Sequence, residues 1–176
     1  MNWEETKEAA LEVATNVAAE ASYRPNGLRV NLYRLAKLVG VDHIFEAELT
    51  TPALLLKNSA GNYDLFVKRG DPVTRQRFSL AHEIGHVLLN SVVELPAQQW
   101  SRLAFAQDPH EDRIEKLCDQ MAAEILMPAP VFENWMGERE WSAFALPEAT
   151  KGYSVSLDAA SRLFLHLFPG KAALVR

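Results

Sequence analysis

The chain has 176 residues and a formal net charge of −5, which disfavours broad binding to the phosphates of nucleic acids. Hydrophobic residues make up 48% of it and charged residues 23%, an ordinary globular composition. This length predicts a single domain over residues 1–176 with one hydrophobic core. Because the net charge is negative, a direct nucleic acid partner is not expected.

A cytoplasmic location is expected. Residues 1–8 are polar and acidic, unlike a signal peptide, and no apolar run approaches the length of a membrane span. The one cysteine, Cys118, excludes an internal disulfide and fits a reducing compartment. Cys118 falls on the apolar side of its predicted helix, so it is expected to be a buried small hydrophobe rather than a nucleophile or a metal ligand.

Two helices are predicted in the N-terminal part. The first covers residues 2–22, with Asn2 as its cap and Glu5 at the capping-box position. Its apolar stripe consists of Trp3, Ala10, Val13, Val17 and Ala21. The second covers residues 31–39 and is capped by Asn31.

The hydrophobic period then changes to that of strands. Residues 43–49, 53–57 and 63–68 read as three strands, and residues 58–61 as a hairpin turn between the last two. We predict a small antiparallel sheet that leads directly into a helix beginning at about Thr74. An exposed edge of this sheet could bind an extended peptide as a further strand.

The C-terminal part is predicted to be helical with one irregular stretch. Residues 131–136 form a short helix, residues 138–153 are irregular or briefly helical, and Ser156 caps a last amphipathic helix. The tail over residues 172–175 could add one strand.

Residues 82–86 read His82-Glu83-Ile84-Gly85-His86, the HExxH spacing of a zinc metallopeptidase. On a helix, positions i and i+4 share one face, so both imidazoles can bind one metal ion. Glu83 follows the first histidine directly and can act as the general base toward a water at the metal. The plain alternative is a helix with two surface histidines and an incidental glutamate.

The surroundings of this motif argue against that alternative. Apolar residues flank it on both sides, at 78–81 and 87–89, which predicts a buried helix whose polar groups need partners. Gly85 inside the helix costs about 1 kcal/mol relative to alanine, which suggests close approach of another backbone or of a ligand.

A catalytic zinc normally has three protein ligands, and the candidate for the third lies in a helix predicted within residues 111–128. Glu115 borders the apolar stripe of that helix and can point at the motif. Asp119, one turn further, can accept the free ring N–H of a ligating histidine. A solvated acidic face is the alternative for this pair, and the upstream motif favours the ligand interpretation.

Two motifs together carry a family resemblance. Residues 77–89, which include the HExxH motif, and residues 115–128, which end in Ala-Ala-Glu-Ile-Leu-Met-Pro, resemble the signatures of the ImmA/IrrE family of bacterial and phage metallopeptidases. A weaker likeness extends from about residue 30 to 163. Family members often have an acidic residue where Leu117 stands and an aromatic where Met121 stands, and neither change touches a candidate ligand.

The resemblance implies an α+β fold, namely a mainly helical zincin-like domain with the three-stranded sheet before the HExxH helix. It implies a zinc endopeptidase of the gluzincin type, and members commonly cleave a helix-turn-helix repressor and so act in transcription regulation. By motif, His82, His86 and Glu115 are the metal ligands, Glu83 is the catalytic base and Asp119 orients a ligand. Mn²⁺ is also possible, since a His₂Glu set accepts several divalent ions.

Two questions stay open at this point. The residue that stabilises the oxyanion could be any of His110, Arg113, Tyr153 and His166, because spacing singles out none of them. The alternative function is a non-proteolytic regulatory or antitoxin-like partner that keeps the fold. Retention of Glu83 argues against it, because metal binding alone does not require a base.

Overall fold

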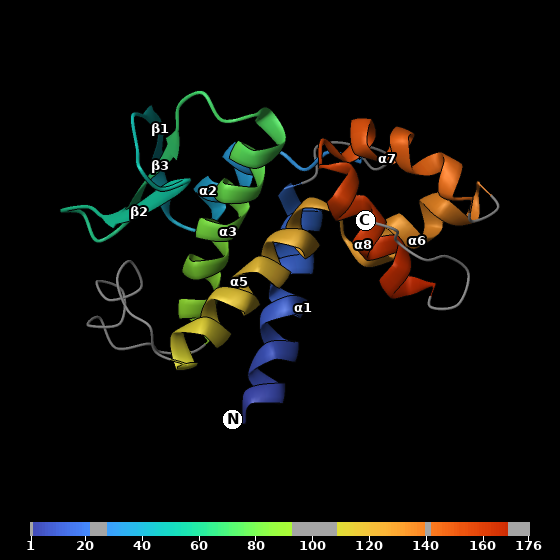
Figure 1. Cartoon of the computed structure of the whole chain (residues 1–176). Helices are drawn as coiled ribbons and strands as arrows, with labels where there is room; N and C mark the ends of the chain where they lie inside the picture. The colour runs from blue at the N-terminus through green and yellow to red at the C-terminus, as the bar shows by residue number, and fades with distance from the viewer. Residues whose placement is uncertain (1, 22–27, 93–108, 140–141, 169–176) are drawn as a thin grey trace.

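The computed structural model describes residues 2–21, 28–92, 109–139 and 142–168, with the side chains of 109–112 left out. It is an α+β fold, as expected, in which a small sheet lies at one side and the helices α6, α7 and α8 gather at the other (Figure 1). Between them the helices α1, α3 and α5 pack on one another, and this central group contains the functional motif. No described helix is long and apolar enough to cross a membrane.

The N-terminal helices follow their predicted caps. Helix α1 spans Trp3–Ala21, and at its start Glu5 N–H donates to Asn2 Oδ1 at 3.0 Å while Asn2 N–H donates to Glu5 Oε2 at 2.9 Å. Helix α2 spans Leu32–Leu38, and its Arg34 N–H donates to Asn31 Oδ1 at 3.1 Å.

The buried stripe of α1 differs in part from the predicted one. Its fully buried apolar residues are all alanines: Ala10, Ala14, Ala18 and Ala21. Val13 and Val17 are only partly buried against the same core. Small side chains let α1 lie close to its neighbours α3 and α5, which explains why alanines and not valines occupy the contact.

The sheet contains the three expected strands but is mixed, so the prediction of a wholly antiparallel sheet was wrong. Strands β1 (Val41–Ala47), β2 (Ala53–Lys57) and β3 (Tyr63–Lys68) lie in the order β1-β3-β2. The hairpin partners β2 and β3 are antiparallel, whereas β1 is parallel to β3. The central strand β3 buries two side chains, Leu65 and Val67, whereas β1 buries only Val41 and β2 buries none. β1 and β2 are therefore the two edges.

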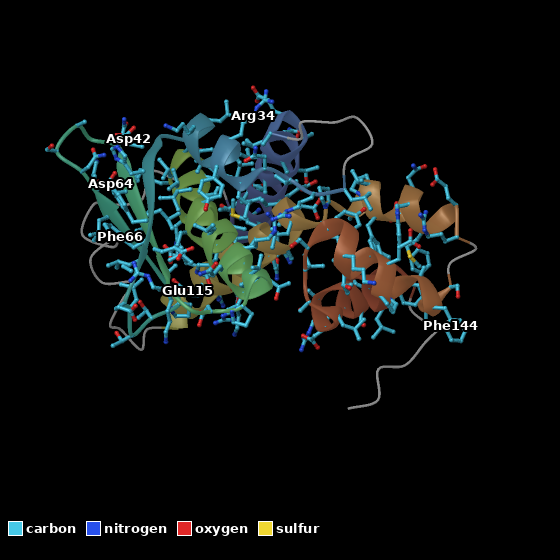
Figure 2. The ribbon with its side chains drawn as sticks, turned by 90° about the horizontal axis from the view of Figure 1, so that it is seen from above. Arg34, Asp42, Asp64, Phe66, Glu115 and Phe144 are labelled. Atoms are coloured by element: carbon cyan, nitrogen blue, oxygen red, sulfur yellow. The ribbon has the colours of Figure 1, made fainter. Side chains whose placement is uncertain are left out.

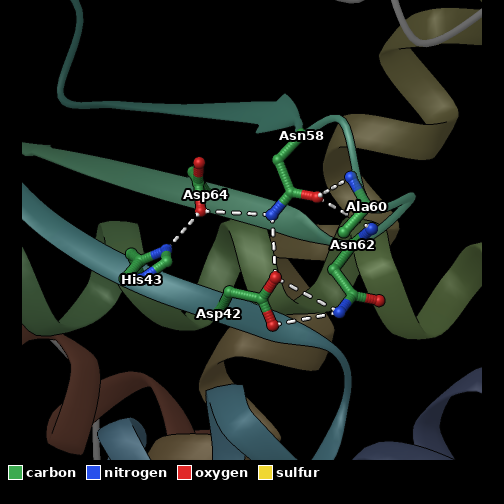
Figure 3. A network of polar contacts seen from close by, with 6 residues as sticks. All are labelled: Asp42, His43, Asn58, Ala60, Asn62 and Asp64. Carbon is green, nitrogen blue, oxygen red and sulfur yellow. Dashed lines mark hydrogen bonds and ion pairs between the residues drawn. The ribbon is translucent and has the colours of Figure 1, made fainter.

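A polar network joins the β2–β3 turn to the start of β1 (Figure 3). The Asn58 side chain accepts from the backbone N–H groups of Ala60 and Asn62, both at 3.1 Å, and donates to Asp42 at 2.8 Å. Asn62 Nδ2 donates to the same Asp42 carboxylate at 3.0 Å, and His43 contacts Asp64 at 2.9 Å. These hydrogen bonds tie the hairpin to the edge strand that is distant in sequence.

Helix α3 spans Val73–Val92 and crosses α5, which spans Pro109–Leu126. Gly85 lies at this crossing. A Cβ atom there would be 3.4 Å from the backbone oxygen of Cys118 and 3.5 Å from Met121 Cβ. The predicted close approach of another backbone at Gly85 is thus confirmed, and that backbone belongs to α5.

The C-terminal part has more helix than predicted. Helix α6 (Ala129–Gly137) follows α5 directly, the 3₁₀ turn η1 (Ala143–Ala145) leads into α7 (Leu146–Tyr153), and α8 (Leu157–Leu167) comes last. Ser156 caps α8, as predicted, by accepting from Ala159 N–H at 3.1 Å. The strand proposed for residues 172–175 lies outside the described residues.

Candidate metal centre

Helix α3 places the two histidines of the motif one above the other. The Nε2 atoms of His82 and His86 are 3.1 Å apart, and their ring centroids 4.8 Å. His86 is buried and His82 is mostly buried, which follows from the apolar residues that surround them on α3. Both rings therefore turn the same nitrogen toward one point.

Glu115 reaches that point from α5. Its Oε2 lies 3.1 Å from His82 Nε2, and its Oε1 lies 3.4 Å from His86 Nε2. One donor atom from each of the three residues lies within 4.8 Å of the others. In Figure 2 the labelled Glu115 lies beside α3, far from Phe144 among the C-terminal helices.

This donor set fits a metal ion of the zinc class. Two imidazole nitrogens and one carboxylate match the His₂Glu set of catalytic zinc sites. Ligand atoms of a tetrahedral ion with bonds of about 2.0–2.1 Å lie roughly 3.3 Å apart. The separations between the donors of His82, His86 and Glu115, from 3.1 to 3.4 Å, agree with that spacing.

The Nδ1 atoms of both histidines also have partners on α5. His82 Nδ1 lies 2.8 Å from Asp119 Oδ1, and His86 Nδ1 lies 3.3 Å from Cys118 Sγ. The structure thus places Asp119 where the sequence suggested, against a histidine of the motif. The Cys118 contact was missed, although its position three residues after Glu115 and one before Asp119 puts it on the same face of α5.

Electrostatics separate the two histidines. Burial alone would lower the pKa of His82, but the hydrogen bonds with Asp119 and Glu115 and the charges of Glu83 and Glu115 outweigh it and raise this pKa to about 9. Burial and the charge of His82 lower the pKa of His86 to about 4.

Glu83 has a distinct environment. Burial raises the pKa of its carboxyl group to about 7, the charge of Glu115 acts in the same direction, and His82 opposes both. A carboxylate whose pKa approaches neutrality can take and return a proton. Burial raises the pKa of the Cys118 thiol as well, so that its neutral form is favoured.

Three of the four oxyanion candidates have described side chains, and each of these lies in other surroundings. Arg113 lines a cavity with Trp3 and Lys7 of α1, Tyr153 is buried against Phe132 and Trp135, and His166 lies exposed on the last turn of α8. The side chain of His110 lies outside the described residues.

A helix carrying HExxH, crossed by a second helix that supplies a glutamate, is the arrangement typical of metallopeptidases. The family model for the IrrE N-terminal-like domain, a peptidase family, matches residues 37–163. Because this match covers most of the chain, the protein belongs to that family, in agreement with the resemblance to ImmA/IrrE proteins.

Two relatives are both named radiation response metalloprotease IrrE. The one from Deinococcus radiodurans is 40% identical over 86 residues, and the one from Deinococcus deserti is 36% identical over 86 residues. These segments cover 49% of this chain but only 26% and 30% of the two relatives. The chain therefore matches less than a third of the length of these proteins.

Proposed function

We propose that this protein is a zinc-dependent endopeptidase that cleaves a specific regulatory protein. The observation that carries the proposal is the convergence of His82, His86 and Glu115 on one point, next to the partly buried Glu83. The family and the two metalloprotease relatives support the same class of reaction.

Each residue of the centre has a role in this proposal. His82, His86 and Glu115 hold the metal, and Asp119 keeps the ring of His82 in place through its Nδ1 contact. When bound, a zinc ion makes water more acidic and polarises a peptide carbonyl. Glu83 accepts the proton of the attacking water and delivers it to the leaving amine.

The substrate we propose is a folded regulatory protein, with a helix-turn-helix repressor as the first candidate. The ImmA/IrrE resemblance supports this target. β2 is an edge strand in contact with α3, the helix that carries the motif, so an extended segment of the substrate can pair with it there.

The experiment mixes the purified protein with a helix-turn-helix repressor encoded beside its gene. Glu83→Gln should lower the cleavage rate by roughly 10²–10⁴-fold, as expected for loss of a general base, while bound zinc stays unchanged. Glu12→Gln, on the exposed side of α1, is the matched control and should cleave at the wild-type rate. Chelation should stop cleavage, and added Zn²⁺ should restore it.

Two results would contradict the proposal in different ways. Cleavage that survives both Glu83→Gln and chelation would rule out the mechanism. Tight binding of the repressor by the wild-type protein, with zinc bound and no cleavage, would favour the non-proteolytic partner instead.

A further inference from the structure

The contact between Cys118 and His86 is a polar feature of the described centre that the proposed chemistry leaves unused. Cys118 Sγ lies 3.3 Å from His86 Nδ1, within hydrogen-bonding range for sulfur. The cysteine is fully buried and the histidine is 6% exposed, so water does not compete freely for either atom. A contact of this kind at a buried imidazole restricts how the ring can turn.

The orientation of the rings decides which nitrogen needs a partner. The Nε2 atoms of His82 and His86 face each other and Glu115, so these are the nitrogens turned toward the proposed metal position. A neutral imidazole with an open Nε2 carries its hydrogen on Nδ1, and that N–H must donate to an acceptor. Asp119 accepts from His82, and the sulfur of Cys118 is in the equivalent position for His86.

The packing of α3 on α5 is what brings the sulfur within reach. Gly85 precedes His86, and a Cβ atom there would stand 3.4 Å from the backbone oxygen of Cys118, so the two helices are in contact at this point. Glu115, Cys118 and Asp119 are spaced i, i+3 and i+4, so they lie on one face of α5. From that face Glu115 reaches the Nε2 atoms of the two histidines, while Asp119 reaches Nδ1 of His82 and Cys118 reaches Nδ1 of His86.

We propose that Cys118 is a positioning residue for His86: its sulfur accepts the Nδ1–H hydrogen bond and so holds Nε2 toward the metal position. This inference rests on the proposed function, since it concerns the same metal centre. It assigns the cysteine a role through the histidine, with no bond to the metal and no part in the proton transfers. A sulfur acceptor is weaker than a carboxylate, so its contribution is smaller than that of Asp119.

The test compares Cys118→Ala with Cys118→Ser, a pair that differs by a single hydroxyl group. Both remove the sulfur and its packing, and only serine keeps an acceptor near Nδ1. The affinity for Zn²⁺ alone is measured by competition with a chelating indicator, and the ring nitrogens of His86 are followed by NMR in the zinc-loaded proteins. Urea unfolding of the metal-free variants reports packing separately.

We expect Cys118→Ala to bind Zn²⁺ about 10-fold more weakly, the lower end of the effect of losing a partner of a ligating histidine. The Hδ1 proton of His86 should be protected from exchange in the wild type and in Cys118→Ser and should exchange faster in Cys118→Ala. Equal losses of affinity in both variants would reduce Cys118 to packing and overturn the inference, as would an unchanged Cys118→Ala. A wild-type protein that binds no Zn²⁺ would instead overturn the proposed function itself.

Discussion

The described residues contain two histidine–aspartate pairs with almost the same geometry, one on the sheet and one at the α3–α5 crossing. His43 Nδ1 lies 2.9 Å from Asp64, and His82 Nδ1 lies 2.8 Å from Asp119. The side chain of His43 is 62% exposed, whereas that of His82 is 16% exposed. The pair distance alone thus does not distinguish a surface contact from a candidate metal centre.

What surrounds each pair makes the difference. Nδ1 of His82 contacts Asp119, and its Nε2 faces His86 and Glu115. His43 stacks on Phe45, and its aspartate takes part in the Asn58 network that joins the strands (Figure 3). His82 therefore lies among other candidate ligand atoms, whereas His43 and Asp64 belong to a network within the sheet.

The largest expected effect separates the two histidines. His82→Ala removes a proposed ligand and should reduce zinc binding by more than the ~10–100-fold loss that follows removal of a ligand's partner. His43→Ala should leave the bound zinc of the purified protein unchanged. Metal content by elemental analysis and affinity by chelator competition measure both. Equal metal content in the two variants would contradict the proposal that His82 is a ligand and His43 is not.

The aspartates provide the next comparison. Asp119→Ala should weaken Zn²⁺ binding by about 10–100-fold, because the ring of His82 loses the acceptor that orients it. Asp64→Ala should leave the affinity at the wild-type value, since its partner His43 lies on the sheet. A loss for Asp119→Ala no larger than that for Cys118→Ala would show that a carboxylate adds nothing over a thiol here.

The crossing of α3 and α5 can be tested without touching a ligand. Gly85→Val places a branched side chain against the backbone of Cys118 and should destabilise the fold by about 1–3 kcal/mol through overpacking. Gly85→Ala is the control, since its Cβ makes only a 3.4 Å contact and gains about 1 kcal/mol of helix propensity. Urea unfolding of the metal-free proteins measures both. A Gly85→Val variant as stable as Gly85→Ala would mean that the helices can move apart at little cost.

The smallest effect is expected at the sheet. Asn58→Ala removes the centre of the network and should lower the free energy of unfolding by about 1–2 kcal/mol, with zinc affinity unchanged. The hydrogen bond from Asn58 is the main cause that lowers the pKa of Asp42 below its ordinary value of 3.8. A lowered pKa adds stability above the ordinary value that is lost as the pH falls through the folded value. The difference in free energy of unfolding between wild type and Asn58→Ala should therefore shrink below about pH 4. A difference that stays constant with pH would contradict this prediction.

The sequence by itself determined the local elements and the identity of the chemical groups. Capping residues such as Asn2, Asn31 and Ser156 marked where helices begin, because a side-chain acceptor satisfies the first free N–H groups wherever the rest of the chain lies. The i, i+4 spacing of His82 and His86 predicted a shared face for the same reason, since helical periodicity is a local property.

Tertiary structure decided everything that depends on which segments meet. The parallel pairing of β1 with β3 joins segments that are not adjacent in the sequence, and chain order did not predict it. Of the charged residues near the second motif, Glu115 and Asp119 face α3 while Arg113 faces α1. Only the contact between the two helices, which meet at Gly85, could reveal that the sulfur of Cys118 reaches His86, because such a contact depends on the packing distance between helices.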